Sequence, residues 1–298
     1  MTRLAAVAGL VRLVHPFPSL LCATATGTIA ALAGADPPTI LRLFVGMLAI
    51  QVSIGALNDL VDAPLDAAQK PRKPIPSGLV TPRVAGLVAA GGGAGGIALS
   101  AISGPATGLA AVGCLALGYL YDVRLSRTAL SWLPLSLALP LLPIHAWLGA
   151  TGTIPAGLLT LVPVGVLAGA GLALANGLAD VDRDTRAERG TIVVRLGPRR
   201  AWISQTLALA AAAGLAVLVA PAVPGAVAGD TLGLLRVVRG GGILFGIAAL
   251  ALGAVALVSP RASVRERGWE LEAIGVVGLG IGWLAGTAAG VASGGAAL

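Results

Sequence analysis

The chain has little charge, few aromatic rings and only two cysteines. Charged residues make up 11 % of its 298 positions and hydrophobic residues 56 %, whereas about a quarter of residues are charged in soluble globular domains. This balance excludes an ordinary soluble domain and indicates a membrane protein. Cys22 and Cys114 both fall in apolar stretches and provide no disulfide framework. Aromatic residues make up 3 %, so few rings are present for stacking or cation–π contacts.

Nine apolar stretches are long enough to span a bilayer, because about 20 residues cover the hydrocarbon core. The stretches are rich in alanine and in the chain's 43 glycines, and small residues let transmembrane helices approach closely. We therefore expect an all-α membrane protein, a bundle of nine transmembrane helices forming one domain over residues 1–298. The stretches lie near 17–35, 38–57, 83–103, 106–121, 129–150, 154–177, 201–223, 238–258 and 270–292.

The basic residues are divided unevenly between the two sets of loops that nine spans define. One set holds 17 of the 20, including a cluster at 261–267 that is expected to be a loop, and the other holds only Arg42, Arg236 and Arg239. The positive-inside rule then predicts a cytoplasmic N-terminus and an outer C-terminus, with a short outer loop at 224–237. A net charge of +7 is compatible with nucleic-acid binding, but this asymmetry accounts for it, so we expect an inner- or plasma-membrane protein with no nucleic-acid partner.

Two short acidic segments, 58–66 and 176–184, interrupt the apolar chain and hold six of its 13 acidic residues. Each contains Asn, Asp and Asp at spacings of four, at the predicted cytoplasmic end of a span, and a basic loop follows each. Ionisable groups near a bilayer are costly and usually functional, so the pair predicts a functional site. The residues concerned are Asn58, Asp59, Asp62, Asp66, Asn176, Asp180 and Asp184.

Helical geometry places the members of the first segment on one face. At about 100° per residue, Asp59, Asp62 and Asp66 share with Asn58 a sector about 100° wide. Pro64 lacks a backbone donor and predicts a kink or a helix end before Asp66, in which case Asp66 reaches the site from a loop.

If the second segment is one continuous helix, its Asn and two of its aspartates occupy the same angular positions as Asn58, Asp62 and Asp66 do in the first. Asp180 and Asp184 then lie about 40° and 80° from Asn176, whereas Asp182 lies at about 240° and points elsewhere.

Carboxylate-lined faces without histidine or cysteine are typical of sites for a hard cation. Mg²⁺ prefers oxygen ligands and is usually held by one or two carboxylates together with substrate phosphates. Two facing clusters would hold a diphosphate and make it a better leaving group. Basic side chains nearby can bind phosphate oxygens. These cations, next to an apolar bundle, predict a substrate with a diphosphate head and a hydrocarbon tail. They are Lys70, Arg72, Lys73, Arg124 and Arg127.

The remaining polar side chains are assigned structural roles. Acidic residues outside the two arrays are expected to be solvated or paired with cations, and the two histidines to make hydrogen bonds. The acidic residues are Asp122, Asp182 and Glu188, and the histidines are His15 and His145.

With these segments the chain resembles the UbiA superfamily of intramembrane aromatic prenyltransferases. The first family motif has the form N-D-x-x-D-x-x-x-D, which residues 58–66 match in full. A basic-Pro-x-Pro-x-Gly signature follows from Lys73 to Gly78, and many members have Arg at the position of Lys73. A Tyr followed by a basic residue in the middle cytoplasmic loop is similar to Tyr121 with Arg124 or Arg127.

The second family motif is altered in this chain. Many members carry D-x-x-D-x-x-x-D. Here the first Asp is missing, and Asn176 lies one position earlier in an array that ends at Asp184. The segment 190–197 again resembles the family, whereas Glu188 stands where the family often has Gly.

The resemblance implies a Mg²⁺-dependent prenyltransferase within the membrane. Such an enzyme transfers a prenyl group from a prenyl diphosphate to a lipophilic acceptor, often aromatic or a quinone precursor, after magnesium-promoted ionisation to an allylic cation. By matching positions, the resemblance gives the catalytic magnesium shell as Asn58, Asp62, Asn176 and Asp180. It gives Asp59, Asp66 and Asp184 as further metal ligands or as groups that hold the ligands. It gives the diphosphate contacts as Lys73, Tyr121, Arg124 and Arg127. Lys70 and Arg72 are added as diphosphate contacts because they lie in the basic loop after the first segment.

Two other functions use the same features. A terpene cyclase on this scaffold would need the same motifs but trap the cation within its own chain. A cation transporter could use the carboxylates, although transporter sites usually lie near mid-membrane and these clusters lie at the predicted cytoplasmic ends. The acceptor, the prenyl chain length and the oligomeric state stay open at this point.

Overall fold

The structure is a computed structural model that describes residues 3–221 and 230–292. Within these residues all regular structure is helical. The helices are α1 (Arg3–Leu13), α2 (Pro16–Leu32), α3 (Pro37–Gln69), α4 (Pro82–Ala101), α5 (Pro105–Leu120), the π-helix η1 (Tyr121–Leu125), α6 (Leu133–Thr151), α7 (Ala156–Leu159), α8 (Leu161–Ala179), α9 (Val181–Arg186), α10 (Ile192–Leu196), α11 (Pro198–Leu218), α12 (Asp230–Ala256) and α13 (Ala262–Ala292).

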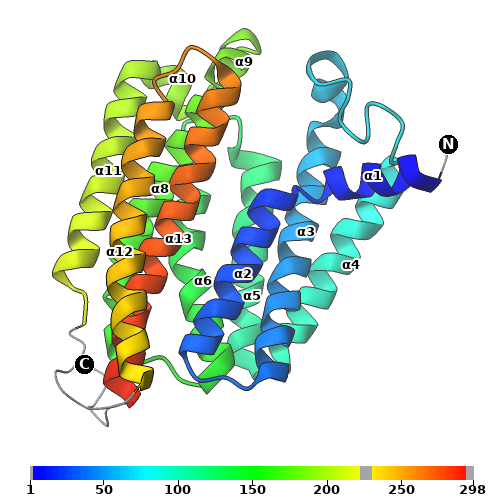
Figure 1. The fold of residues 1–298 in the computed structure, drawn as a ribbon. Coiled ribbons are helices and arrows are strands. Elements are labelled where there is room, and N and C mark those ends of the chain that lie inside the picture. The colour runs from blue at the N-terminus through cyan, green and yellow to red at the C-terminus, as the bar shows by residue number, and fades with distance from the viewer. Residues whose placement is uncertain (1–2, 222–229, 293–298) are drawn as a thin grey trace. The chain divides into compact units, whose positions relative to one another are not determined.

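The helices are long and apolar enough for an integral membrane protein. Eight spans in the described part of the chain meet the length and hydropathy needed to cross a bilayer. A ninth is obtained if α1 and α2, which meet at a bend of 64°, count as one span (Figure 1). The predicted all-α membrane fold is thus confirmed, with eight or nine candidate spans.

Several predicted boundaries are wrong. The stretch predicted at 38–57 is the start of a longer helix, α3, which continues through the whole first acidic segment. Helix α12 already begins at Asp230, so the predicted outer loop 224–237 is helical in its second half; residues 224–229, and the end of the span predicted at 201–223, lie outside the described residues. All of the predicted loop at 261–267 except Arg261 belongs to the first part of α13, which begins at Ala262.

Helix starts follow local sequence signals. Asp36 precedes α3, and its carboxylate accepts a hydrogen bond of 3.1 Å from the backbone N–H of Thr39. Asp36 is exposed, and this hydrogen bond lowers the pKa of its carboxyl group. Thr81 caps α4 in the same way, and prolines occupy the first positions of both helices, where a missing N–H is harmless.

The described residues group into two compact units. The first comprises residues 3–31, 35–124 and 145–152, and the second comprises residues 32–34, 125–144, 153–221 and 230–292. The first acidic segment belongs to the first unit and the second segment to the second unit. Each unit is described below by itself.

In the first unit α3 packs against α4 and α5, and α1 contacts α3. Glycine permits the α3–α4 contact: a Cβ atom on Gly96 would lie 2.6 Å from Ile50 Cγ1 and 2.7 Å from the carbonyl oxygen of Gly46. A buried apolar cluster lies at the motif-bearing end of α3 and includes Leu13, Ala56, Val80, Ala85 and Ala89. This cluster anchors α1 and the segment after α3 to the helix that carries the motif.

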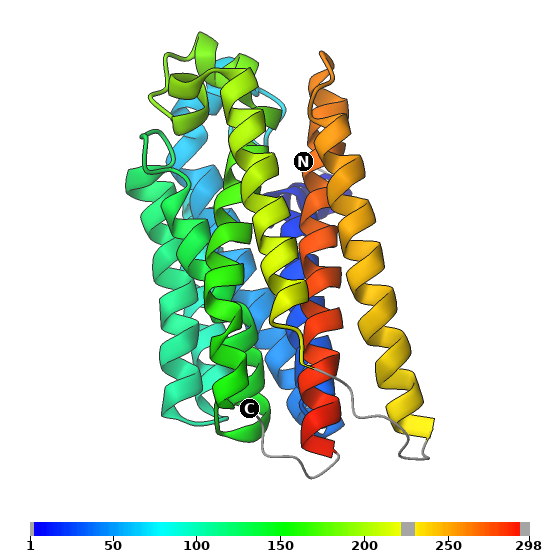
Figure 2. The ribbon, with the colours of Figure 1, turned by 90° about the vertical axis from the view of Figure 1, so that its left-hand side faces the viewer.

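In the second unit α12 and α13 run side by side, as both views show (Figures 1 and 2). Helix α8 packs against α11 and α13. The end of α8 is surrounded by an apolar cluster formed by Leu174, Ala175, Leu178, Val181, Val193, Ala201 and Leu257. The second acidic segment therefore begins on a well-packed helix end.

Candidate functional site

The first acidic segment lies entirely on α3. The helix runs through Pro64 and ends only at Gln69, and the N–H of Lys70 still donates to the carbonyl oxygen of Asp66 at 2.7 Å. The prediction that Pro64 would end the helix is therefore wrong, and Asp66 is a helical residue.

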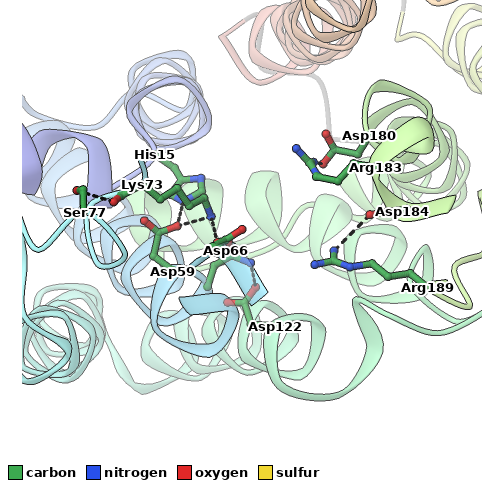
Figure 3. Close-up of polar contacts among 11 residues, drawn as sticks. His15, Asp59, Asp66, Lys73, Ser77, Asp122, Asp180, Arg183, Asp184 and Arg189 are labelled. Atoms are coloured by element: carbon green, nitrogen blue, oxygen red, sulfur yellow. Dashed lines mark hydrogen bonds and ion pairs between the residues drawn. The ribbon is translucent and has the colours of Figure 1, made fainter. Parts of the chain in front are cut away.

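Asp59 and Asp66 are both buried and share one cation (Figure 3). The Nζ atom of Lys73 lies 2.7 Å from Asp59 Oδ1 and 2.9 Å from Asp66 Oδ2. Burial of the Lys73 ammonium acts to lower its pKa, but the hydrogen bonds and charges of the two carboxylates outweigh burial and raise the pKa. Lys73 therefore stays charged and ties the loop after α3 to the motif.

A second basic side chain contacts the same carboxylate. His15 Nε2 lies 3.0 Å from Asp59 Oδ1, as expected for a histidine that makes hydrogen bonds. His15 sits at the bend between α1 and α2 and has a positive φ of 47°. Gly55 allows this close approach, because a Cβ there would lie 3.2 Å from His15 Cδ2.

Asp122 is a site residue that the sequence interpretation missed. It was expected to be solvated or salt-bridged, but it is buried, and its Oδ1 accepts a hydrogen bond of 3.0 Å from Asn58 Nδ2. It lies in the π-helix η1 beside Tyr121 and Arg124, and π-helical turns are frequent at functional sites. The amide nitrogen of Asn58 thus donates to Asp122, and this hydrogen bond does not use the amide oxygen Oδ1. The sequence feature that could have identified Asp122 is its position directly after Tyr121 in the middle loop.

A cationic pocket opens beside Asp59 in the first unit. Its volume is about 430 Å³, and its lining combines basic side chains from α1 and from the loop after α3. Arg12, which the sequence interpretation did not select, joins two predicted phosphate ligands, Lys70 and Arg72. The full lining is Arg12, His15, Pro16, Asp59, Lys70, Arg72, Lys73 and Pro74.

The second acidic segment is not one continuous helix. Helix α8 ends at Ala179, Asp180 adopts φ −100° and ψ 1°, and the short helix α9 begins at Val181. The predicted angles relative to Asn176 therefore hold only up to the break. Asn176 is half-buried in the last turn of α8.

Each aspartate of the second array has a basic neighbour (Figure 3). Asp180 forms an ion pair with Arg183. Asp184 is buried, and its Oδ1 lies 3.4 Å from Nη1 of Arg189.

Asp182 lies in α9, beyond the break, and pairs with Arg265. The distance from Arg265 Nη2 to Asp182 Oδ2 is 2.5 Å. Arg265 was expected to lie in a topogenic loop. It is instead a buried residue in the first turn of α13. Two residues further along the same helix, Arg267 is exposed and pairs with Glu270 at 2.7 Å.

The remaining predicted phosphate ligands lie in the middle loop. Tyr121 is half-buried in η1, and Arg124 and Arg127 are exposed. The structure thus leaves both guanidinium groups accessible from outside the protein.

The donor set suits Mg²⁺. Asp59 Oδ2 is buried and has no hydrogen-bond partner among the described residues, so an acceptor oxygen is present for a cation. No three His, Cys, Asp or Glu side chains form a ready-made metal cluster in the described part of the chain. Because Mg²⁺ is usually held by only one or two carboxylates and completes its shell with water and phosphate, the arrangement is compatible with this ion.

The fold and the acidic motifs define an all-helical intramembrane protein with two Asn/Asp arrays. The model of the UbiA prenyltransferase family matches residues 19–268. The chain therefore belongs to the UbiA prenyltransferase family, as its motifs predict. No curated protein sequence matches the chain significantly.

Solved structures share the fold. One, from work on digeranylgeranylglyceryl phosphate synthase in membranes, has a TM-score of 0.66 at 16 % identity and covers 94 % of this chain and 98 % of that one. An apo UbiA homolog from Aeropyrum pernix K1 has a TM-score of 0.65 at 19 % identity, covering 89 % and 96 %. A UbiA homolog from Archaeoglobus fulgidus bound to GPP and Mg²⁺ has a TM-score of 0.64 at 16 % identity, covering 92 % and 99 %.

Proposed function

We propose that this chain transfers a prenyl group from a prenyl diphosphate to a lipophilic acceptor, aromatic or a quinone precursor, with Mg²⁺ as cofactor. The observation that carries the proposal is the first acidic motif. Its Asn58 is oriented by a buried aspartate, its Asp59 has a buried oxygen that no described residue hydrogen-bonds, and a cationic pocket adjoins it. The solved homolog with GPP and Mg²⁺ has the same fold and supports this choice of substrate and ion.

The acidic residues would hold the metal. Asn58 and Asp62 from the first motif, and Asn176 and Asp180 from the second, are the proposed catalytic ligands. When bound, Mg²⁺ would neutralise the diphosphate and make it a better leaving group. In the reaction the bond between the prenyl C1 and the diphosphate oxygen breaks, and its electron pair leaves with the diphosphate. A bond forms between C1 and the acceptor, which loses a proton.

The remaining acidic residues have supporting tasks. Asp59 and Asp66 bind Lys73 and thereby fix the loop that carries Lys70 and Arg72. Asp184 is proposed as a further metal ligand or as a group that holds one.

Basic side chains would bind the diphosphate oxygens. Lys70 and Arg72 line the cationic pocket together with Arg12, and Lys73 adds its charge at the same place. Tyr121, Arg124 and Arg127 are the proposed contacts from the middle loop. Arg binds phosphate bidentately and Lys acts as a point charge. With aromatic residues at only 3 % of the chain, the departing diphosphate would supply most of the stabilisation of the developing allylic charge.

The reaction would take place at the cytoplasmic side of the inner or plasma membrane. The 17-to-3 division of basic residues supports an N-terminus in the cytoplasm and a C-terminus outside. We also propose that residues 1–298 act as a single domain in which both acidic motifs serve the same reaction.

The test is prenyl transfer by the purified chain in lipid nanodiscs. Incubation with farnesyl or geranylgeranyl diphosphate, Mg²⁺ and a panel of phenolic and naphthoic acceptors should yield a prenylated product, and EDTA should abolish the product. D62A and D180A should each lower the rate about 100-fold or more, because each removes charge stabilisation of the leaving group. The control is E266A, since Glu266 is exposed and lies outside both motifs.

Other outcomes would point elsewhere. A cyclic hydrocarbon formed without any acceptor would replace transfer by terpene cyclisation. Full activity of both D62A and D180A would overturn the site. Ion flux in liposomes that depends on these two aspartates, without any prenyl product, would identify a cation transporter.

A further inference from the structure

Arg265 lies where an arginine is unfavourable unless it binds something specific. It occupies the first turn of α13, at the positive end of that helix dipole, where a cation is disfavoured. It is only 6 % exposed, and a buried charge is costly unless it is paired and hydrogen-bonded. A role in membrane topology alone would not require its burial.

The guanidinium group makes four hydrogen bonds, which account for its position. Two go from Nη1 to the loop carbonyl oxygens of Ser259 and Pro260, each at 3.0 Å. Nε donates to the carbonyl oxygen of Leu178 at 3.0 Å, and Nη2 donates to the Asp182 carboxylate at 2.5 Å. All three nitrogens are thus used, and three different segments of the second unit are joined.

Two of these bonds lie on either side of the break between α8 and α9. In an uninterrupted helix the Leu178 carbonyl would accept from the N–H four residues later, which belongs to Asp182. At the break the Leu178 carbonyl accepts from the backbone N–H of Asp180 instead, and Arg265 supplies a second donor to the same oxygen. The Asp182 side chain, beyond the break, is bound by the same guanidinium. Asp180, the residue at the break, is therefore held between two contacts to one rigid group.

We propose that Arg265 is a positioning residue for the second acidic motif. It holds the α8–α9 break in the conformation that directs the carboxylates of Asp180 and Asp184 toward the metal. Asp182 is then the anchor of the motif and takes no part in binding the ion. This inference rests on the proposed function, because it assumes that the second motif binds Mg²⁺.

Holding the break between α8 and α9 requires an arginine at position 265 and not merely a positive charge. The planar fork binds a carbonyl and a carboxylate at fixed angles, whereas the lysine ammonium is a flexible point charge. Residues that orient metal ligands typically contribute 10- to 100-fold to metal affinity. A lysine at position 265 would keep the charge and lose the geometry.

The test measures metal binding and folding separately. Full-length chain in nanodiscs is titrated with Mn²⁺, with bound ion followed by electron paramagnetic resonance, and the Mg²⁺ concentration for half-maximal prenyl transfer is measured alongside. R265K and D182A should each weaken Mn²⁺ binding about 10-fold and raise the Mg²⁺ requirement similarly. Because the Asp182 side chain is 58 % exposed, D182A should fold even if R265K does not.

R267Q is the matched control. Arg267 lies on the same helix, but its partner Glu270 is outside the motif, so metal binding should be unchanged. Wild-type Mn²⁺ affinity in D182A and in folded R265K would overturn the inference, as would a fall in melting temperature without any change in metal binding. A wild-type chain that binds no Mn²⁺ would refute the proposed function itself, and this inference with it.

Discussion

At the residue scale, single side chains in this protein satisfy several partners at once. The ammonium of Lys73 serves two buried carboxylates, and the guanidinium of Arg265 serves three carbonyl oxygens and one carboxylate. The loss of either cation would leave buried acceptors unpaired, which is costly in a low-dielectric interior.

Glu188 gives a prediction at this scale. The residue has a positive φ of 51°, in the left-handed region that costs a side-chain-bearing residue roughly 1–2 kcal/mol. The UbiA resemblance places Gly at this position, and the backbone geometry explains that preference. E188G should therefore raise the free energy of unfolding by about 1 kcal/mol after the greater entropy of the unfolded glycine is included. Reversible unfolding in mixed detergent micelles measures it.

The neighbouring alanine supplies the control for Glu188. Ala187 has a φ of −88°, so glycine brings no relief there. A187G should lower the free energy of unfolding by about 0.5–1 kcal/mol. If E188G destabilised the chain as much as A187G does, strain at position 188 would be ruled out.

At the element scale, the helices are interrupted where the chemistry is placed. The π-helix η1 extends α5 and buries Asp122, and the break at Asp180 separates α8 from α9. Elsewhere, helices such as α3 and α4 pack closely through small residues. The irregular turns at η1 and at Asp180 carry polar side chains, while the long helices provide the apolar bundle.

The α3–α4 contact yields a prediction at the element scale. A Cβ on Gly96 would lie 2.6 Å from Ile50 Cγ1, so G96A must push the two helices apart. Overpacking of this kind costs about 1–3 kcal/mol. Gly95, on the same helix, has nothing within 4 Å of an added Cβ, and G95A should be neutral or stabilising by up to about 1 kcal/mol. Equal effects of the two variants, measured by micelle unfolding, would contradict close packing at Gly96.

At the scale of the whole molecule, we propose that the two acidic segments and most of the basic residues lie on the same side of the membrane. Both acidic segments adjoin loops rich in Lys and Arg, and the opposite set of predicted loops holds only three basic residues. The topology proposed from this division places the substrate diphosphate in the cytoplasm, with the hydrocarbon chain in the bilayer.

Cysteine labelling tests that topology. In a chain whose Cys22 and Cys114 are replaced by alanine, R199C should stay unlabelled when a membrane-impermeant maleimide is added to intact cells, because the positive-inside rule puts it in the cytoplasm. T153C should be labelled under the same conditions. Both positions are exposed in the structure. Inside-out vesicles should reverse the pattern, and labelling of R199C in intact cells would contradict the proposed orientation.

The sequence by itself determined the class of fold and the identity of the motifs. Long apolar stretches can satisfy their backbone groups in a bilayer only as helices or closed barrels, so hydropathy sufficed for the all-α prediction. The full N-D-x-x-D-x-x-x-D match was enough to predict the UbiA family.

Only the tertiary structure decided what each charged side chain contacts. Pro64 stays within α3, where local rules predict a helix end, and α8 breaks at Asp180, where they predict continuity. Asp122 meets Asn58 across 64 positions and Arg265 meets Asp182 across 83. Such contacts depend on how helices pack, and no periodicity within one segment encodes them. The motifs could therefore be read from the chain, but the groups that orient them become visible only in the folded molecule.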